Sequence, residues 1–314
     1  MLSLLFHLLA RLPLRWLHAA GAVLGRLVFR ASPRYAGHLQ ENMARAGFGD
    51  RTLARRAAEE AGKSVLEIPY VWFANPKRVL GRSRAANWRL IEEAQTPLVA
   101  RDGLEKNASH AGKGVIFLTP HLGCFEITAQ YIAANPPPDG TPLTVLYRPP
   151  RKPWLTAVME EGRAKKNLVP APANLQGVRQ MVRALKRGEA IGMLPDQVPN
   201  AGEGVWAPFF GRPAFTMTLP AKLQQLSGAP ILLTYGERLP LGKGWIVHFE
   251  RFDDDLSGPP EEQAARINAA IERLIRRCPE QYFWGYDRYK TPKGASRPKR
   301  APEPAEAERQ GEAR

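Results

Sequence analysis

The chain has 314 residues, 44% of them hydrophobic, a composition that excludes a disordered chain and a polytopic membrane protein. Lysine and arginine exceed aspartate and glutamate by 15, so we expect an anionic partner such as nucleic acid, anionic lipid or an acidic protein. Two cysteines, Cys124 and Cys278, exclude a disulfide framework and a four-cysteine zinc site, and they fit a reducing compartment.

Residues 1–30 predict two short membrane-associating helices, because Pro13 should end the first one and no stretch reaches about 18 uncharged apolar residues. The charged side chains of this segment are all basic: Arg11, Arg15, Arg26 and Arg30. We expect the apolar faces to lie in the lipid interface, with the arginines against anionic head groups. Two alternatives stay open: a pair of soluble core helices, and one tilted span with snorkelling arginines.

Residues 35–95 predict polar-faced helices, and from about residue 96 strands alternate with helices. The expected strands are short apolar runs at 114–119, 143–147, 190–194, 230–235 and 245–249. The expected helices of this part lie at 125–132, 178–187 and 261–277. This alternation predicts an α/β fold with a mostly parallel central sheet flanked by helices.

The chain is therefore divided into membrane-associating helices (1–30), an α/β domain (31–290) and a tail (291–314). A chain of this length can form two domains, or one large α/β domain with additional segments. The tail lacks large apolar residues, so it cannot bury a core and is expected to be disordered.

The strongest candidate for chemistry is the stretch TPHLGCFE at 119–126. His121 lies just past a buried strand, where open α/β sheets bind ligands, and Glu126 lies five residues further, near the start of the next helix. A tight turn at Gly123 can fold the carboxylate towards the imidazole. A carboxylate on one ring nitrogen fixes the tautomer and leaves the other nitrogen to take a proton from a hydroxyl. The alternative is a histidine that only caps the helix.

The spacing H-x-x-x-x-E resembles the acyltransferase motif of the lysophospholipid acyltransferase superfamily, and most closely its lipid A biosynthesis lauroyl/myristoyl branch. Further stretches agree in the family's order: NM at 42–43, GF at 47–48, YRP at 147–149, LKRG at 185–188, LPDQ at 194–197, FFG at 209–211, GAP at 228–230, QYFW at 281–284 and RYK at 288–290. The resemblance covers nearly everything from residue 1 to about 293. The ordered series is specific, whereas a single match would mean little.

This resemblance implies a membrane-associated O-acyltransferase. It would move a fatty acyl chain from an acyl-carrier-protein thioester to a hydroxyl of a lipid A precursor at the cytoplasmic face of the inner membrane. It implies His121 as general base, Glu126 as its partner, and Arg148 and Asp196 as residues that bind the acceptor or shape the site. The implied partners are the acyl carrier protein, an anionic glycolipid and the membrane, with no cofactor. A lysophospholipid or aminolipid acceptor stays open, because it also presents a hydroxyl.

Attack on a thioester builds negative charge on the carbonyl oxygen, which requires a donor at that position. Arg148 or a backbone N–H near Gly123 could supply it, and Arg148 could equally be a surface arginine. Asp196 could orient a cation or a sugar hydroxyl, or start an Asx-turn. Arg163, with the two lysines that follow it, could bind phosphate or belong to a solvated helix face.

Other functions and site types are less well supported by the residues. Cys124 could form an acyl-enzyme next to His121, but a buried cysteine is usually inert. The remaining histidines have no metal-ligand spacing, so no metal is predicted, and no glycine-rich phosphate loop follows a strand. A non-enzymatic partner of nucleic acid is disfavoured, because the basic residues are spread along the chain without a recognisable module.

Overall fold

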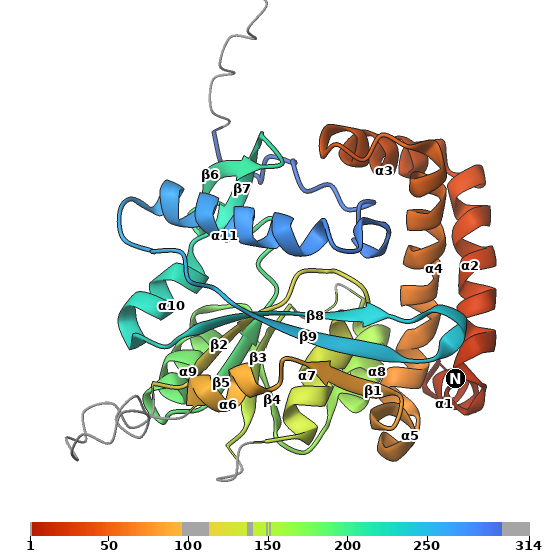
Figure 1. The fold of residues 1–314 in the computed structure, drawn as a ribbon, viewed down its shortest axis with the longest axis horizontal. Helices are drawn as coiled ribbons and strands as arrows, with labels where there is room; N and C mark the ends of the chain where they lie inside the picture. Colours follow the sequence, from red (N-terminus) through yellow and green to blue (C-terminus); the bar gives the residue numbers. More distant parts are fainter. Residues whose placement is uncertain (1, 96–112, 137–140, 149, 151, 297–314) are drawn as a thin grey trace, which may run out of the picture.

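The structure, a computed structural model, describes residues 2–95, 113–136, 141–148, 150 and 152–296 (Figure 1). The strands are β1 (Ser83–Ala86), β2 (Val115–Leu118), β3 (Leu143–Tyr147), β4 (Leu168–Pro172), β5 (Ala190–Met193), β6 (Gly204–Phe209), β7 (Arg212–Met217), β8 (Ile231–Arg238) and β9 (Trp245–Arg251). The helices are α1 (Leu2–Arg11), α2 (Leu14–Ala31), α3 (Pro33–Arg45), α4 (Arg51–Phe73), α5 (Pro76–Leu80), α6 (Arg89–Gln95), α7 (Phe125–Ala134), α8 (Pro153–Arg163), α9 (Leu175–Lys186), α10 (Leu219–Ser227) and α11 (Pro260–Ile275), with 3-10 turns η2 (Pro240–Gly242) and η3 (Pro279–Gln281).

A seven-stranded sheet in the order β1-β9-β8-β2-β5-β3-β4 forms the centre of the molecule. The strands from β8 to β4 run parallel, whereas β9 is antiparallel to β8 and carries β1 alongside it. A separate antiparallel pair, β6 and β7, lies beside α11 (Figure 1). The expected α/β fold with a mostly parallel sheet is confirmed.

Helices cover both faces of this sheet, which is why its central strands are continuous apolar runs. β2 is buried along its whole length. Ile116 and Leu118 belong to one core, shared with α9, while Val115 and Phe117 belong to a second core, shared with α7. Alternate residues of a strand point to opposite faces, so one short strand supplies both cores.

The strands that the sequence did not predict lie at the sheet edges or in the β6–β7 hairpin. β4 carries Pro170 and Pro172, which lack the N–H that a central strand needs. It pairs only with β3 at the edge, where such residues are tolerated. β1 has the sequence SRAA and occupies the opposite edge, inside a region predicted to be helical. The predicted tail at 291–314 lies, from residue 297 onward, outside the described residues.

The N-terminal helices stand at one end of the molecule, where α2 and α4 lie side by side (Figure 1). The expected break at Pro13 is confirmed, because α1 ends before it and α2 begins after it. Glycines let the two backbones approach: a Cβ on Gly25 would lie 2.0 Å from the carbonyl oxygen of Ala58, and one on Gly62 equally close to that of Gly21. No described helix combines the length and the apolarity that crossing a membrane requires.

A buried carboxylate ties these helices to the sheet. Glu67 of α4 accepts hydrogen bonds from Arg238 of β8, at 2.9 Å from Nε, and from Trp245 of β9, at 3.1 Å. The ring of His18 from α2 lies 3.0 Å from the same carboxylate oxygen. Burial alone would raise the pKa of Glu67, but the charges and hydrogen bonds of Arg238 and His18 lower it to about 2. The N-terminal helices are thus fixed relative to the strand ends.

Candidate active site

His121 is held rigidly at the carboxyl end of β2. Its carbonyl oxygen accepts a hydrogen bond from the N–H of Phe283 at 3.1 Å, and the N–H of Gly123 donates to the carbonyl of Gln281 at 2.9 Å. Gly123 has φ +61, and a Cβ there would lie 2.0 Å from the carbonyl oxygen of Gly236. Only glycine fits this turn, which brings the chain from the strand into α7.

Asp196, at the carboxyl end of the neighbouring strand β5, is the hydrogen-bond partner of His121. Its Oδ1 lies 2.8 Å from Nδ1 of the imidazole, and its Oδ2 accepts the backbone N–H of His121 at 2.9 Å. The carboxylate is 3% exposed. The carboxyl ends of parallel strands lie at the same edge of a sheet. His121 and Asp196 therefore meet although they are 75 positions apart in the sequence.

The second ring nitrogen, Nε2 of His121, faces Gln197. The side-chain amide nitrogen of Gln197 lies 3.0 Å from it and donates its hydrogen bond there. When the imidazole is neutral and Asp196 accepts the proton of Nδ1, Nε2 carries the lone pair. A substrate hydroxyl that replaces Gln197 at this position would meet a base.

The electrostatics favour a charged Asp196. Burial by itself would raise the pKa of Asp196, but the charge and hydrogen bonds of His121 outweigh it, and Arg288 adds to them, so that the pKa is lowered. Arg288 is itself buried and donates to the carbonyl of Phe215 and the hydroxyl of Thr216, both at 2.8 Å. The carboxylate can therefore stabilise an imidazolium that forms during proton transfer.

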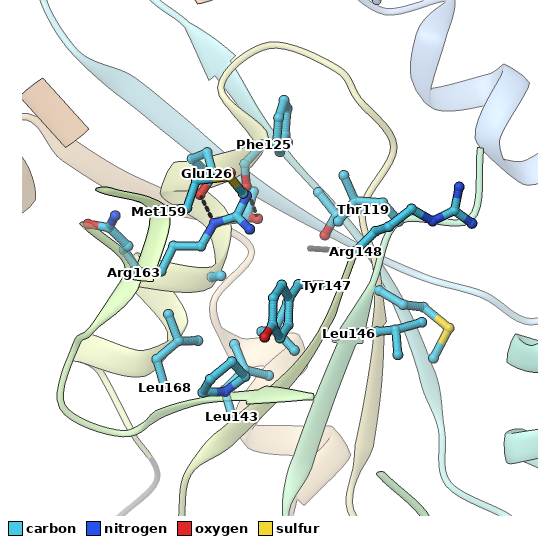
Figure 2. Close-up of a pocket in the computed structure, with 18 of the residues that line it drawn as sticks. Thr119, Phe125, Glu126, Leu143, Leu146, Tyr147, Arg148, Met159, Arg163 and Leu168 are labelled. Carbon is cyan, nitrogen blue, oxygen red and sulfur yellow. Dashed lines mark hydrogen bonds and ion pairs between the residues drawn. The ribbon is translucent and has the colours of Figure 1, made fainter. Parts of the chain in front are cut away.

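Glu126 has other partners than the sequence predicted. Its carboxylate forms an ion pair with Arg163 of α8 (Figure 2). It also accepts a hydrogen bond from the indole N–H of Trp72 at 3.0 Å. The expected fold-back of Glu126 towards the imidazole of His121 is not the arrangement observed, because Asp196 contacts Nδ1 and Gln197 contacts Nε2. The helical turn directs Glu126 towards α4 and α8 instead, where Arg163 forms an ion pair with it.

A cavity of about 690 Å³ opens beside His121 and Glu126. In Figure 2 the Glu126–Arg163 pair and Met159 stand on one side of it, and Leu143 and Leu168 at one end. Its remaining wall is mostly apolar and comes from β2, β3, β5 and α7: Phe117, Phe125, Ala129, Ile132, Val145, Leu146, Gly192 and Met193. A mostly apolar space that also presents polar groups fits a long hydrocarbon chain with a reactive head.

Arg148 follows β3, lines the cavity and is exposed to solvent. Its side chain extends away from the Glu126–Arg163 pair (Figure 2). The alternative oxyanion donors near Gly123 are already used, because the N–H groups of Leu122, Gly123 and Cys124 donate to carbonyl oxygens at 2.7, 2.9 and 2.7 Å. Arg148 is the predicted donor that remains accessible.

Cys124 does not have the environment of a nucleophile. The thiol is 3% exposed, and burial, together with the negative charge of Glu67, raises its pKa well above the ordinary value. A protonated, inaccessible thiol does not attack a thioester. In the described part of the chain, no group of three or more histidine, cysteine, aspartate or glutamate side chains is arranged to hold a metal ion.

Trp72, Gln197 and the ring of Phe125 also contact the site residues, and no role was predicted for them from the sequence. Gln197 directly follows Asp196, a predicted site residue, and this position in the sequence could have indicated a role for Gln197. Trp72 lies in α4, and no local pattern links it to Glu126, 54 residues away. The structure thus brings together His121, Asp196 and Gln197 as one group, and Glu126, Arg163 and Trp72 as another.

Comparison with known proteins identifies the family of this chain. The family "Bacterial lipid A biosynthesis acyltransferase" matches residues 2–291. The chain belongs to this family and is an acyltransferase.

Its relatives in Escherichia coli K12 include a lipid A biosynthesis lauroyltransferase, 26% identical over 90% of this chain and 88% of the relative. A lipid A biosynthesis palmitoleoyltransferase from the same strain is 29% identical over 73% of this chain and 69% of the relative. A lipid A biosynthesis acyltransferase of Shigella flexneri has the same identity and coverage as the palmitoleoyltransferase.

Proposed function

We propose that this enzyme transfers a fatty acyl chain from an acyl-carrier-protein thioester to a hydroxyl of a lipid A precursor, with His121 as the general base. The observation that carries the proposal is the position of the His121 imidazole, with Nδ1 bound to Asp196 and with Nε2 facing Gln197, which lines the cavity together with His121. Family membership supports the acceptor class. The excess of basic residues suits both an acidic carrier protein and a phosphorylated glycolipid.

In the proposed reaction the acyl chain occupies the apolar cavity with its thioester near His121. Nε2 removes the proton of the acceptor hydroxyl as the oxygen attacks the carbonyl carbon. The guanidinium of Arg148 stabilises the negative charge on the carbonyl oxygen. The carbon–sulfur bond then breaks, and the departing thiolate takes the proton from the imidazolium, which leaves an ester and a free thiol.

Two carboxylates have separate roles in this proposal. Asp196 orients the imidazole and balances its charge, as a buried carboxylate does in a hydrolase triad. Glu126 holds Arg163 and Trp72, so that α4, α7 and α8 meet on one side of the cavity. The motif glutamate then shapes the acyl site rather than acting on the ring nitrogen.

The proposed location is the cytoplasmic face of the inner membrane, held there by the N-terminal helices. Their large apolar side chains are exposed along α1 and α2: Leu4, Leu5, Leu8, Trp16, Val23, Leu24, Leu27 and Val28. No acidic residue occurs in either helix, and Arg11, Arg15 and Arg30 are exposed. An apolar face with basic neighbours suits the interface of an anionic membrane.

This face adjoins the cavity. Ser3 of α1 donates a 2.8 Å hydrogen bond to Glu161 of α8, and the ring of Phe6 lies 5.9 Å from that of Phe73 at the end of α4. The same α8 contributes Met159 and Arg163 to the cavity wall. A lipid acceptor held at α1 and α2 would therefore lie next to the acyl chain.

Mass spectrometry of total lipids and lipid A tests the proposal in a strain from which the gene is deleted. Wild-type enzyme should restore one secondary acyl chain of lipid A, and His121→Ala, checked for unchanged thermal unfolding, should not. Restoration by the histidine variant would refute the assignment of the base. Loss of an acyl group from a lysophospholipid-derived lipid or an aminolipid, with lipid A intact, would reassign the acceptor.

A further inference from the structure

Phe283 is an exposed aromatic ring beside the imidazole. Its side chain is 42% exposed, although its backbone N–H donates to the carbonyl of His121. The two ring centroids lie 6.4 Å apart, with an angle of 32° between the planes. Single exposed apolar side chains are common on protein surfaces, but this ring lies next to the candidate base, where a bound substrate can cover it.

The two phenylalanines next to His121 lie in different surroundings. Phe125, with its centroid 4.8 Å from the imidazole, lines the apolar cavity. Phe283 does not line the cavity and faces solvent. If the cavity holds the donor's acyl chain, the acceptor must reach Nε2 from outside it, and Phe283 marks that outer side.

The segment that carries Phe283 is firmly anchored. Gln281 exchanges two hydrogen bonds with the backbone of Arg238, at 2.8 and 3.0 Å. The indole of Trp284 donates to the carbonyl of Pro279 at 2.6 Å, and the hydroxyl of Tyr286 accepts the N–H of Val198 at 3.0 Å. A ring presented by a fixed backbone loses little conformational freedom when a ligand covers it.

We propose that Phe283 is a specificity-determining residue for the acceptor, binding the carbon framework that adjoins the hydroxyl to be acylated. This inference rests on the proposed function, because it places the donor in the cavity. The face of a phenyl ring offers apolar contact to a hydrocarbon chain and also to the C–H face of a sugar ring. Either contact positions the hydroxyl at Nε2, which would displace the amide of Gln197.

Steady-state kinetics of the full-length enzyme test the proposal, with acyl-carrier-protein donor and a lipid A precursor that lacks secondary acyl chains. Phe283→Ala should raise the acceptor KM by about tenfold or more, as expected for losing the burial of an aromatic side chain. The donor KM should not change, because Phe283 does not line the cavity in which the acyl chain is proposed to lie. Leu226→Ala, which removes an equally apolar side chain that is 74% exposed on α10, is the matched control.

Two further variants identify what the ring contacts. Phe283→Leu keeps apolar area without an aromatic face, and Phe283→Tyr keeps the face. If leucine retains the acceptor KM, the contact is a hydrocarbon chain; if only tyrosine does, it is a sugar ring.

Three results would overturn the inference. They are an unchanged acceptor KM in Phe283→Ala, a donor KM that rises as much as the acceptor KM, and a raised acceptor KM in both Phe283→Leu and Phe283→Tyr. Absence of transfer by the wild-type enzyme overturns the proposed function instead, so the two failures are distinguishable.

Discussion

Asp196 contacts His121 twice, at the backbone N–H and at Nδ1, over 2.9 and 2.8 Å. One carboxylate therefore fixes both the position of the residue and the direction of its ring. The pairing joins the ends of β2 and β5, which are hydrogen-bonded neighbours in the sheet. The geometry of the site is consequently a property of the sheet and not of the motif at 119–126.

Replacing Asp196 by asparagine should lower kcat by about three orders of magnitude, because an amide does not hold the tautomer or stabilise the imidazolium. Rates of acyl transfer and thermal unfolding should be measured together for Asp196→Asn and Glu126→Gln. We expect the Glu126 variant to keep more activity, with its main effect on donor KM through Arg163. The proposed division of roles is falsified if Glu126→Gln is inactive while Asp196→Asn turns over normally.

Arg148→Gln should reduce kcat by about 10²- to 10³-fold with little change in donor KM, since a guanidinium that stabilises an oxyanion acts mainly in the transition state. Arg148→Lys should recover part of the loss, because it keeps the charge without the planar fork. Pre-steady-state acyl transfer measures the chemical step directly. A raised donor KM with unchanged kcat would assign Arg148 to binding instead.

Gly192 of β5 lines the cavity, and a Cβ placed on it would lie 3.6 Å from Val145 and 3.8 Å from Leu143, in ordinary contact. Alanine should therefore fit, whereas the extra methyl groups of Gly192→Val should take space from the acyl chain. We expect the valine variant to prefer shorter donors in competition between acyl carrier proteins loaded with different chains. Identical product distributions for wild type and Gly192→Val would place the acyl chain elsewhere.

Leu27→Glu should weaken binding to vesicles that contain anionic lipid by about tenfold, since it removes a leucine that is 55% exposed on α2 from the interface. Leu226→Glu makes the same change on α10 and should bind like wild type. Co-sedimentation with vesicles measures both variants. Equal binding of the two would remove α2 from the membrane contact.

Acid stability should depend on Glu67. Its pKa is about 2 in the folded protein and about 4.5 when unfolded, so the unfolded chain takes up the proton first as pH falls. The stabilisation, on the order of 3 kcal/mol, is complete above pH 4.5, declines towards pH 2 and is absent below it. In denaturant titrations, the free energy of unfolding of Glu67→Gln should fall less steeply between pH 5 and pH 2 than that of the wild type. If the variant loses stability as steeply as the wild type when the pH falls, other carboxylates determine the acid stability.

The sequence determined the layout of this protein to a large extent. Buried strands such as 115–118 are bounded apolar runs, and Pro13 separates two helices, so local composition was sufficient to predict them. The edge strands β1 and β4 were missed because serine, arginine and proline do not favour a strand. Only pairing with β9 and β3 makes those segments extended.

The chemistry was predicted in part. His121 stands where the sequence placed it, because a residue directly after a buried strand must lie at the sheet edge. Which carboxylate it would meet could not be read from spacing: Glu126 is five residues away but belongs to a helix that turns it towards Trp72 and Arg163. Asp196 is 75 residues away and reaches the ring because parallel pairing of β2 with β5 aligns their carboxyl ends, an alignment that only the folded sheet creates.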